Sequence, residues 1–439
     1  MTPQPTILTI GTGMSACGAI HQLSTEGIQP VCYDKSPYPG GHTASFEEAE
    51  GWWFDDGPHV SFTTDERIQG LFSEAVDGEY EAVSAVVDNH WKGYWFHHPV
   101  QCNLYGLPID LVVNAIRDFI EAQQAPEGEI RNYQDWLMTA FGRTIAETFP
   151  MVYGLKYHTT EASNMSTDWL GPRLYRPSLE EVLRGALGPQ SEYVHYADRF
   201  RYPKQGGFFS FAKPFLARAD LKLNSALTGI DPEGKVARFS TGEAVAYDAM
   251  ISSVALPELV LLIDQVPDAV REAAGRLAST NCVLVNVGVD REDLSEANWT
   301  YVYDEEMIFT RLSYPHLLSS STVPKGKGSI QCECYYSAKY RPLDRRLEDH
   351  VAPAVADLKR CGILREDDRV LHTSTRLVPH ANIIFDLERN EALKIVDDYL
   401  DHTGILRCGR YGEWGYQWTD ESFKSGEAAA RAALGRDGG

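Results

Sequence analysis

Short apolar runs alternate with small and polar residues at the start of the chain, and this pattern predicts a strand–turn–helix–strand unit. Residues 7–10 form an apolar run typical of a strand, and residues 11–18 are rich in small side chains. Residues 19–26 can form a helix, and a second strand is expected over residues 29–33, ending on Asp34. A nucleotide-binding α/β fold begins with this order of elements.

The rest of the chain changes its pattern in blocks. Residues 63–200 are mostly helical in pattern, with interspersed aromatic residues, whereas residues 280–375 are rich in strand-forming segments. Amphipathic helices are predicted at 111–122 and 179–186, strands at 222–227, 247–253, 282–289, 329–336 and 405–408, and a final helix at about 420–434.

Length and charge restrict the partners that we expect. A chain of 439 residues exceeds what one hydrophobic core usually serves, so two intertwined domains are expected. The net charge of −22 repels nucleic acid and anionic membrane surfaces, so neither is an expected partner. No signal peptide precedes the first strand, and no apolar run reaches the ~18 residues of a membrane span. A reducing cytoplasm is the expected location.

The cysteines do not form a metal-binding pattern. Cys332 and Cys334 stand two apart, as on one face of a strand, and could pair or hold a metal. Buried free thiols are the favoured interpretation for these two and for the other six, and no metal site is predicted. The other six are Cys17, Cys32, Cys102, Cys282, Cys361 and Cys408.

A phosphate cradle is predicted at the end of the first strand. Gly11 permits the tight turn, Gly13 lets the backbone approach a pyrophosphate, and Ala16 is small enough for close packing of helix and strand. The helix that begins at Met14 and Ser15 offers free N–H groups and a partial positive charge to phosphates. Asp34 ends the second strand, where a carboxylate can accept hydrogen bonds from a ribose. These features together predict a dinucleotide site.

The glycines beyond this cradle favour FAD over NAD. Gly40 and Gly41 follow Asp34 closely and let the backbone pass a large flat cofactor. Gly409 and Arg410, followed by Gly426 on the last helix, form a second strand–glycine–helix contact at the other end of the chain. Two such contacts suit a long cofactor that runs through the protein. Further cofactor contacts are expected from Lys35, His42, Thr43, Gly57, Pro58, His59, Trp418 and Ser422.

The expected fold class is therefore α/β, with a Rossmann-type, glutathione-reductase-like FAD-binding domain. This domain is predicted to be discontinuous and to comprise residues 1–90, 200–260 and 395–439. An inserted mixed α+β substrate domain with a helical segment completes the chain: residues 91–199 form the helical cap region and residues 261–394 form the β-rich part.

The chain resembles the flavoprotein superfamily that contains the amine oxidases, protoporphyrinogen oxidase and UDP-galactopyranose mutase, and the resemblance covers nearly its whole length. Residues 11–16, Asp34 and residues 40–41 are similar to the shared FAD fingerprint. The mutase-like branch is indicated by residues 54–59, 201–207, 309–311 and 409–414, with Asp420. The resemblance implies that Arg311 contacts a substrate diphosphate and that residues 409–414 line the flavin.

Two departures from the mutase pattern bear on the reaction. Residues 278–282 (Ala-Ser-Thr-Asn-Cys) stand where the mutases carry another arginine. Residues 381–386 (Ala-Asn-Ile-Ile-Phe-Asp) replace a tyrosine-rich segment. Both changes weaken the expected contact with a nucleotide-sugar diphosphate.

On the substrate side, the candidate catalytic residues are His59, Arg311 and Arg410, and the candidate substrate contacts are Arg311, Tyr335, Tyr336 and Trp414. A guanidinium forms two parallel charge-assisted bonds with a carboxylate or phosphate, and a histidine can move a proton near neutrality. The alternatives are a structural ion pair for Arg311 and a hydrogen-bonded core position for His59. Trp169, Arg173 and Arg176 are expected at a helix start facing the pocket, and Asp55 and Asp56 as solvated turn residues.

Three functions are compatible with these residues. The favoured one is an FAD-dependent oxidoreductase that takes a hydride from a small polar substrate, an amine or a sugar derivative. The second is a mutase-like isomerase in which reduced FAD acts as a nucleophile on a nucleotide sugar. The third is a non-catalytic FAD-binding partner protein. A homodimer is compatible with the sequence, and NAD(P)H or a reductase would serve as the electron source.

Overall fold

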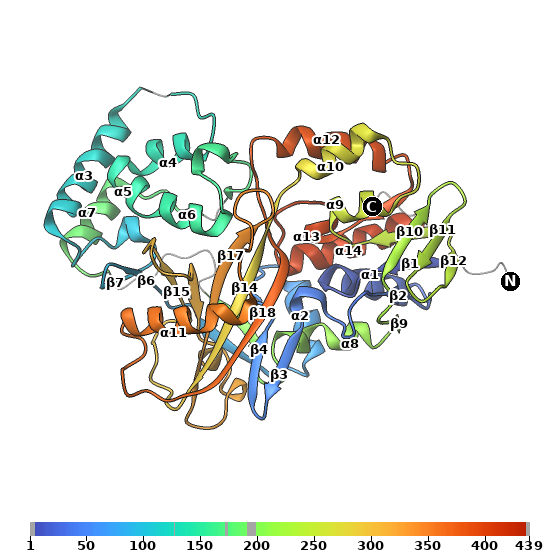
Figure 1. The fold of residues 1–439 in the computed structure, drawn as a ribbon, viewed down its shortest axis with the longest axis horizontal. Coiled ribbons are helices and arrows are strands. Elements are labelled where there is room, and N and C mark those ends of the chain that lie inside the picture. Colours follow the sequence, from blue (N-terminus) through green and yellow to red (C-terminus); the bar gives the residue numbers. More distant parts are fainter. Residues whose placement is uncertain (1–4, 127, 172–173, 191–198, 436–439) are drawn as a thin grey trace.

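The computed structural model describes residues 5–126, 128–171, 174–190 and 199–435. Its elements group into a parallel sheet with helices, a large mixed sheet, and a cluster of helices, which lie at the right, centre and left of Figure 1. The predicted α/β fold class is confirmed: strands 7–10, 31–33, 249–252 and 405–407 join into one parallel sheet.

The parallel sheet has the order β19-β13-β1-β2-β9, and it collects strands from both ends of the chain. Its strands are β1 (Ile7–Ile10), β2 (Val31–Tyr33), β9 (Asp220–Lys222), β13 (Ala249–Ser252) and β19 (Ile405–Arg407). Side chains alternate between its faces. Ile7 and Ile251 pack on α1 (Met14–Thr25) and α14 (Thr419–Ala433), whereas Leu8 and Met250 face a second layer of helices. That layer consists of α9 (Leu256–Leu262), α10 (Asp268–Arg276) and α12 (Arg389–Leu400).

Two glycines bring α1 and α14 into backbone contact. A Cβ on Gly18 would collide with the carbonyl of Phe423, and a Cβ on Gly426 would collide with the carbonyl of Ser15. Gly426 therefore serves the packing of the two helices. The expected cofactor contact from Gly426 is corrected by this placement, because its Cα faces α1.

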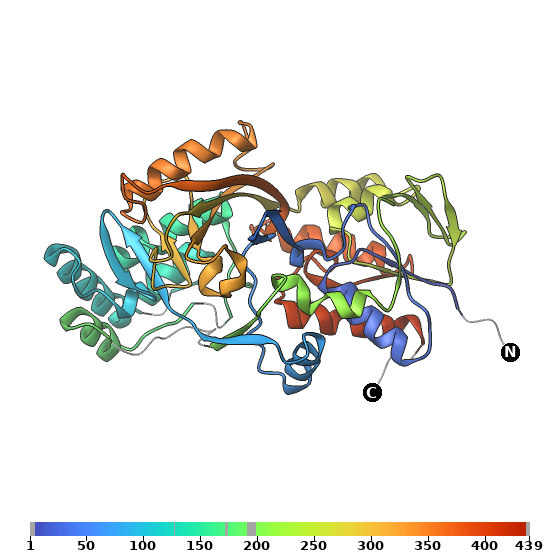
Figure 2. The same cartoon turned by 90° about the horizontal axis from the view of Figure 1, so that it is seen from below.

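The large sheet has seven strands in the order β18-β14-β17-β16-β15-β6-β7. All neighbours are antiparallel except β15 and β6. Its core face packs on α11 (Val351–Arg360), which Figure 2 shows along the outer side of the long strands. The strands are β6 (Val87–Trp91), β7 (Tyr94–His97), β14 (Ser279–Val289), β15 (Trp299–Val302), β16 (Arg311–Ser313), β17 (Gly328–Ser337) and β18 (Val370–Ile383).

The helical cluster packs around Phe119, Leu137, Phe141 and Phe149. It consists of α3 (Ile109–Gln124), α4 (Tyr133–Phe141), α5 (Arg143–Thr148), α6 (Pro150–His158) and α7 (Leu179–Leu187). The remaining elements are α2 (Glu66–Ala75), α8 (Lys213–Leu216) and α13 (Gly409–Gly412), with the strands β3 (Ser45–Ala49), β4 (Trp52–Asp55), β5 (Tyr80–Ser84), β8 (Arg199–Pro203), β10 (Leu227–Asp231), β11 (Val236–Phe239) and β12 (Ala244–Ala246).

Two segments lie elsewhere than the predicted boundaries placed them. β6 begins at Val87, inside the predicted 1–90 segment, yet it pairs with β15 of the large sheet. Helix α10, inside the predicted 261–394 segment, packs on α12 and the core of the parallel sheet. The chain therefore enters the large sheet at about residue 86, where β6 begins, and again at about residue 278, where β14 begins.

The prediction of free, buried thiols is confirmed for all eight cysteines. Among the described residues, no group of His, Cys, Asp and Glu side chains could hold a metal ion. Within the same residues, no helix combines the length and the apolar character that crossing a membrane requires.

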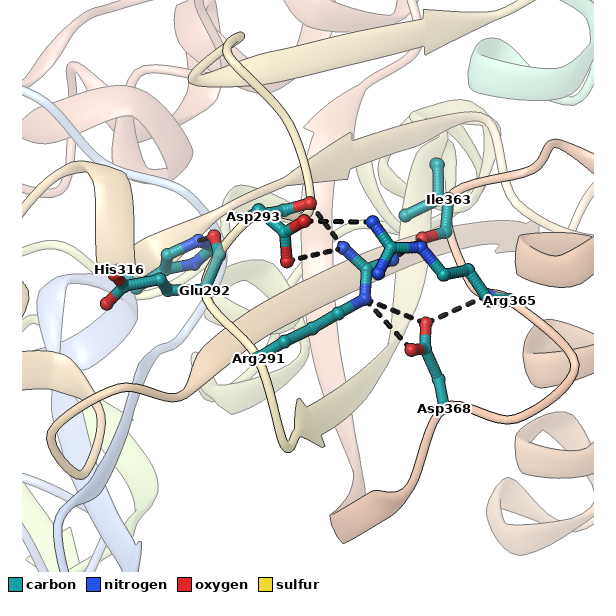
Figure 3. Close-up of polar contacts among 7 residues, drawn as sticks. All are labelled: Arg291, Glu292, Asp293, His316, Ile363, Arg365 and Asp368. Atoms are coloured by element: carbon teal, nitrogen blue, oxygen red, sulfur yellow. Dashed lines mark hydrogen bonds and ion pairs between the residues drawn. The ribbon is translucent and has the colours of Figure 1, made fainter.

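An arginine cluster fastens the loop after β14 to the turn before β18 (Figure 3). Arg291 donates from Nε to both carboxylate oxygens of Asp368, at 2.9 and 3.0 Å, and from Nη2 to the carbonyl of Ile363 at 2.6 Å. Arg365 lies in the same cluster but contacts Asp293 from the surface, with 58% of its side chain exposed. The two arginines therefore differ in burial while they share neighbours.

We expect Arg291→Met to destabilise the fold by about 2 kcal/mol, because Asp368 would keep a buried charge without its main cation. Only 15% of the Arg291 side chain and 8% of the Asp368 side chain are exposed. Arg365→Met is the matched control and should shift the urea midpoint little, because exposed pairs contribute weakly. Equal shifts for the two variants would show that the cluster does not depend on Arg291.

Candidate functional site

A cavity of about 740 Å³ runs from the glycine turn after β1 to the inner face of the large sheet. One end is lined by the turn after β1, the end of β2 and α9, and the other by β14, β16, β17 and α6. Sixteen of the eighteen predicted cofactor residues line it: Gly11, Gly13, Met14, Ser15, Asp34, Lys35, Gly41, His42, Thr43, Gly57, Pro58, His59, Gly409, Arg410, Trp418 and Ser422. Residues from three distant parts of the chain thus meet at one elongated space.

The glycine turn has the geometry of a cradle. Gly11 has φ +103°, and a Cβ there would collide with Ser253 Oγ, so only glycine fits. Gly13 is the N-cap of α1, and the nearest atom to a Cβ there is the carbonyl oxygen of Gly40, at 3.9 Å. A side chain on Gly13 would therefore occupy cavity space. The first-turn N–H groups of α1 lie beside that space without partners in their own helix.

Ala16 and Gly40 do not line the cavity. Ala16 is fully buried, and Gly40, with φ +113°, packs against Phe209. Both shape the turn from behind, so the expected direct contact is corrected for these two residues.

Asp34 lies at the end of β2 as predicted. Its Oδ2 accepts from Thr12 Oγ1 at 2.6 Å and its Oδ1 from the N–H of Ser36 at 2.8 Å. Both contacts fix the carboxylate at the cavity wall, and each oxygen keeps a further lone pair for a ligand.

Asp55, the last residue of β4, and Asp56, the first residue of the loop after it, are both buried, which corrects the expectation of solvated turn residues. Asp55 accepts from Tyr202 at 2.8 Å and from the N–H of Phe208 at 3.1 Å, and Asp56 pairs with Arg376 at 2.8 Å. Burial raises the pKa of each aspartate to about 6. The two carboxylates anchor the loop that carries Gly57 and His59.

His59 faces the cavity from this loop. Its Nδ1 lies 2.8 Å from the carbonyl of Gly57, which makes Nδ1 the donor and leaves Nε2 as an acceptor. Burial lowers the pKa of His59 to about 4, so the ring is neutral at pH 7. His59 is thus a weak base within the cavity.

Arg311 begins β16 at the far end of the cavity. Its Nε donates to Glu333 Oε1 at 2.8 Å, and Glu333, 1% exposed, also accepts from the hydroxyl of Tyr335. Arg311 therefore forms the ion pair that was the structural alternative, and it also lines the cavity as predicted. The guanidinium keeps donors on its terminal nitrogens.

Arg410 lies close by, at the start of α13. It donates to Asn382 Oδ1 at 2.8 Å, an atom that also accepts from Tyr157 at 2.9 Å, and its guanidinium stands 4.3 Å from the ring centre of Tyr416. Its Nε is buried without a hydrogen-bond partner, and among the described residues no carboxylate pairs with it. This arrangement calls for an anion or acceptor from outside the chain.

Two predicted substrate residues lie outside the cavity. Tyr336 points to the opposite face of β17 from Tyr335, where its hydroxyl meets His350 Nε2 at 2.9 Å. Trp414 is fully buried in the core beneath the parallel sheet. Tyr336 faces away from the cavity because adjacent residues on a strand point to opposite sides. Trp414 itself has φ +52°, and its side chain lies in the core.

Of the residues expected at a helix start facing the pocket, Trp169 packs against Tyr133 and His158. Arg176 is exposed and donates to Gln123, and Arg173 lies outside the described residues. The cavity instead contains Tyr157, Tyr301, Glu333, Asn382 and Tyr416, which the sequence reasoning did not single out. Only Glu333 carried a signal, as an acid in the middle of an apolar strand.

A second cavity of about 560 Å³ adjoins the first. The two share Phe62 and Trp418, whose rings meet edge to face with centroids 4.7 Å apart. Its described walls include Gln101, Tyr303 and Lys424. A ligand longer than the first cavity could extend past these rings.

Residues 9–75 match the family model of the NAD(P)-binding Rossmann-like domain. The 15-cis-phytoene desaturase of Narcissus pseudonarcissus is 25% identical over 68 residues, and that of Solanum lycopersicum is 29% identical over 77 residues. The matched regions cover 16% and 17% of this chain and only 12% and 13% of the desaturases. The family model therefore matches only the nucleotide-binding part, and the chain spans a small share of the desaturases' length.

Solved structures resemble the whole chain. A crystal structure of reduced UDP-galactopyranose mutase has a TM-score of 0.93 and 24% identity, covering 99% of this chain and 94% of that one. A putative protoporphyrinogen oxidase from Exiguobacterium sp. 255-15 has a TM-score of 0.74 and 13% identity, covering 99% and 100%. The fold implied by the superfamily resemblance is thereby confirmed.

Proposed function

We propose that this chain is an FAD-dependent enzyme that isomerises an anionic sugar derivative of the nucleotide-sugar class. The observation that carries the proposal is the pair of guanidiniums, Arg311 and Arg410, at the far end of a cavity that begins at a dinucleotide cradle. The whole-chain likeness in fold to UDP-galactopyranose mutase supports it.

The cradle fits FAD. Gly13 leaves open the space that a side chain would fill, so a pyrophosphate could approach the first-turn N–H groups of α1, which would hold it. The carboxylate of Asp34 would accept hydrogen bonds from a ribose. The cavity extends well beyond this cradle, which suits a cofactor with a second half. FAD supplies a hydride acceptor when oxidised and an electron-rich N5 when reduced.

Charge argues against an amine substrate. Two guanidiniums line the far end, and Glu333, the acid beside them, already pairs with Arg311 and Tyr335. An ammonium group would meet net positive charge there, whereas a phosphate or carboxylate would meet unused N–H donors. Arg311 and Arg410 would therefore bind and orient an anionic group, and Tyr157 and Tyr335 would enclose the sugar.

Proton balance favours isomerisation over oxidation. Oxidation of a sugar hydroxyl releases a proton as well as a hydride, and a base must take that proton. His59 has a pKa near 4 and would hold such a proton weakly, while Asp56 and Glu333 are engaged with arginines. An isomerisation returns every atom to the product and needs no strong base.

Hydride transfer from a sugar hydroxyl is the second candidate, and one observation favours it. The Nε2 lone pair of His59 faces the cavity and is left open by the Nδ1 contact with Gly57. This atom could accept a hydroxyl proton while the flavin accepts the hydride.

The redox state of the flavin distinguishes these reactions. We expect UDP-galactopyranose to be converted only after dithionite has reduced the bound FAD, and we expect the flavin to remain reduced after turnover. The measurement is anaerobic absorbance of the flavin together with chromatography of the sugar nucleotide. Bleaching of oxidised flavin by the sugar nucleotide without dithionite would instead support the oxidoreductase.

A further inference from the structure

A lysine is buried next to the turn that precedes β16, the strand that begins with Arg311, and it does not line the cavity. Lys156 on α6 is 7% exposed. Its Nζ donates to the carbonyl oxygens of Asp304 at 2.6 Å, Phe309 at 2.7 Å and Val302 at 3.4 Å. An ammonium has three N–H groups, so the three carbonyls use all of them.

The three carbonyls belong to the connection between β15 and β16. Val302 ends β15, and the turn formed by residues 303–310 leads directly into Arg311. Arg311 and Tyr301 are register partners across these strands, and both line the cavity. Lys156 therefore holds the turn of residues 303–310, which leads into β16 and Arg311.

The residue after Lys156 is a cavity tyrosine. Tyr157 donates to Asn382 and packs on Tyr335, with ring centroids 4.6 Å apart. One turn earlier on the same helix, Tyr153 stacks on Tyr157 and meets Tyr301 edge to face at 5.3 Å. Helix α6 thus presents Tyr157 to the cavity, with Tyr153 packed behind it, while Lys156 bonds to the connection between β15 and β16.

Apolar packing does not account for a lysine at this position. Its partners are main-chain oxygens, and burial lowers its pKa to about 8, so the charged form is costly inside the fold. An apolar side chain of similar length would fill the space but would leave the three carbonyl oxygens without this donor. Three directional bonds from one ammonium do fix the turn, which packing alone does not.

We propose that Lys156 is a positioning residue of the substrate end, whose ammonium fixes the turn of residues 303–310 on α6 and so sets the spacing between Arg311 and Tyr157. The inference rests on the proposed function as far as ligand binding is concerned. The fixed turn itself follows from the contacts of Lys156.

Hydrogen exchange tests the fixed turn without any ligand. In Lys156→Met, amides of residues 303–310 should exchange at least about tenfold faster than in the parent, while residues 7–33 keep their protection. Lys156→Arg keeps the charge and donors and should restore part of the protection. Lys327→Met is the control: it removes a lysine that precedes β17 and pairs with Asp290, away from the turn of residues 303–310. Unchanged exchange in Lys156→Met would overturn the proposal.

Binding of UDP tests the consequence for the site. We expect Lys156→Met to retain FAD and to bind UDP about tenfold more weakly, with partial recovery in Lys156→Arg. The groups that face the ammonium are Asp304, Cys334, Arg341 and Asp357. Because burial lowers the pKa of Lys156 to about 8, parent affinity should fall as pH rises through that value, whereas Lys156→Arg should not show this fall.

The two kinds of failure are distinguishable. Faster exchange of the turn with no UDP binding even in the parent would contradict the proposed function and leave the fixed turn supported. Normal UDP affinity and an unchanged pH profile in Lys156→Met would contradict the positioning role. If Lys156→Met does not fold, the parent and Lys156→Arg still differ in the expected pH profile.

Discussion

Replacing Gly13 with valine is expected to abolish FAD binding. Within the described part of the chain and apart from its two chain neighbours, the nearest heavy atom to a Cβ at this position is the carbonyl oxygen of Gly40, at 3.9 Å. The Gly13→Val variant should therefore fold normally, with the valine side chain projecting into the cradle at the start of α1. The pyrophosphate would lose close approach to the N–H groups of the first turn. We expect at least about a 100-fold loss in FAD affinity, or about 3 kcal/mol, measured by flavin absorbance after reconstitution.

Gly70→Val provides the matched control. Gly70 lies in α2, and a Cβ there has no heavy atom within 4 Å, so this variant tests a glycine-to-valine change away from the cavity. It should bind FAD as the parent does. Normal flavin content in Gly13→Val would show that the cofactor does not approach this turn.

The nucleotide-binding part could be predicted because its signals are local. The run of β1, the glycines after it and Asp34 all lie within residues 7–34, and each has a direct backbone or packing reason. The alternation of apolar residues placed β14, β17 and the final helix to within a few residues. Sixteen of the residues predicted to bind the cofactor accordingly line one cavity.

The substrate end could not be predicted from local patterns, because its members come from distant segments. Tyr157 on α6, Glu333 on β17 and Asn382 on β18 meet only after the large sheet has formed. The burial of Asp55 has the same origin, since Tyr202 and Phe208 arrive from about 150 residues away. The sequence also did not show which of two adjacent tyrosines lines the cavity: Tyr335 faces the cavity, and Tyr336 faces the core.

Replacing Arg410 with methionine is expected to weaken the binding of the sugar nucleotide while changing the stability of the fold little. Among the residues that the structure describes, no carboxylate pairs with the guanidinium, so its loss leaves none of these acids unpaired. The free energy of unfolding should therefore change by less than about 1 kcal/mol. Affinity for UDP-galactopyranose should fall about 100-fold, near 3 kcal/mol, because charge-assisted bonds to the anion are lost. Flavin content should be retained, since the glycine turn and Asp34, which are expected to hold the pyrophosphate and the ribose, are unchanged.

Arg407→Met should behave in the opposite way and serves as the control. Arg407 is three residues earlier, only 17% of its side chain is exposed, and it pairs with Asp397 and Asp401 outside the cavity. Its loss leaves Asp397 without its ion-pair partner, so stability should fall while affinity for the sugar nucleotide stays unchanged. Urea unfolding and titration of UDP-galactopyranose monitored by flavin absorbance measure both quantities on each variant. Unchanged affinity in Arg410→Met would remove Arg410 from the substrate site and leave Arg311 as its anion-binding group.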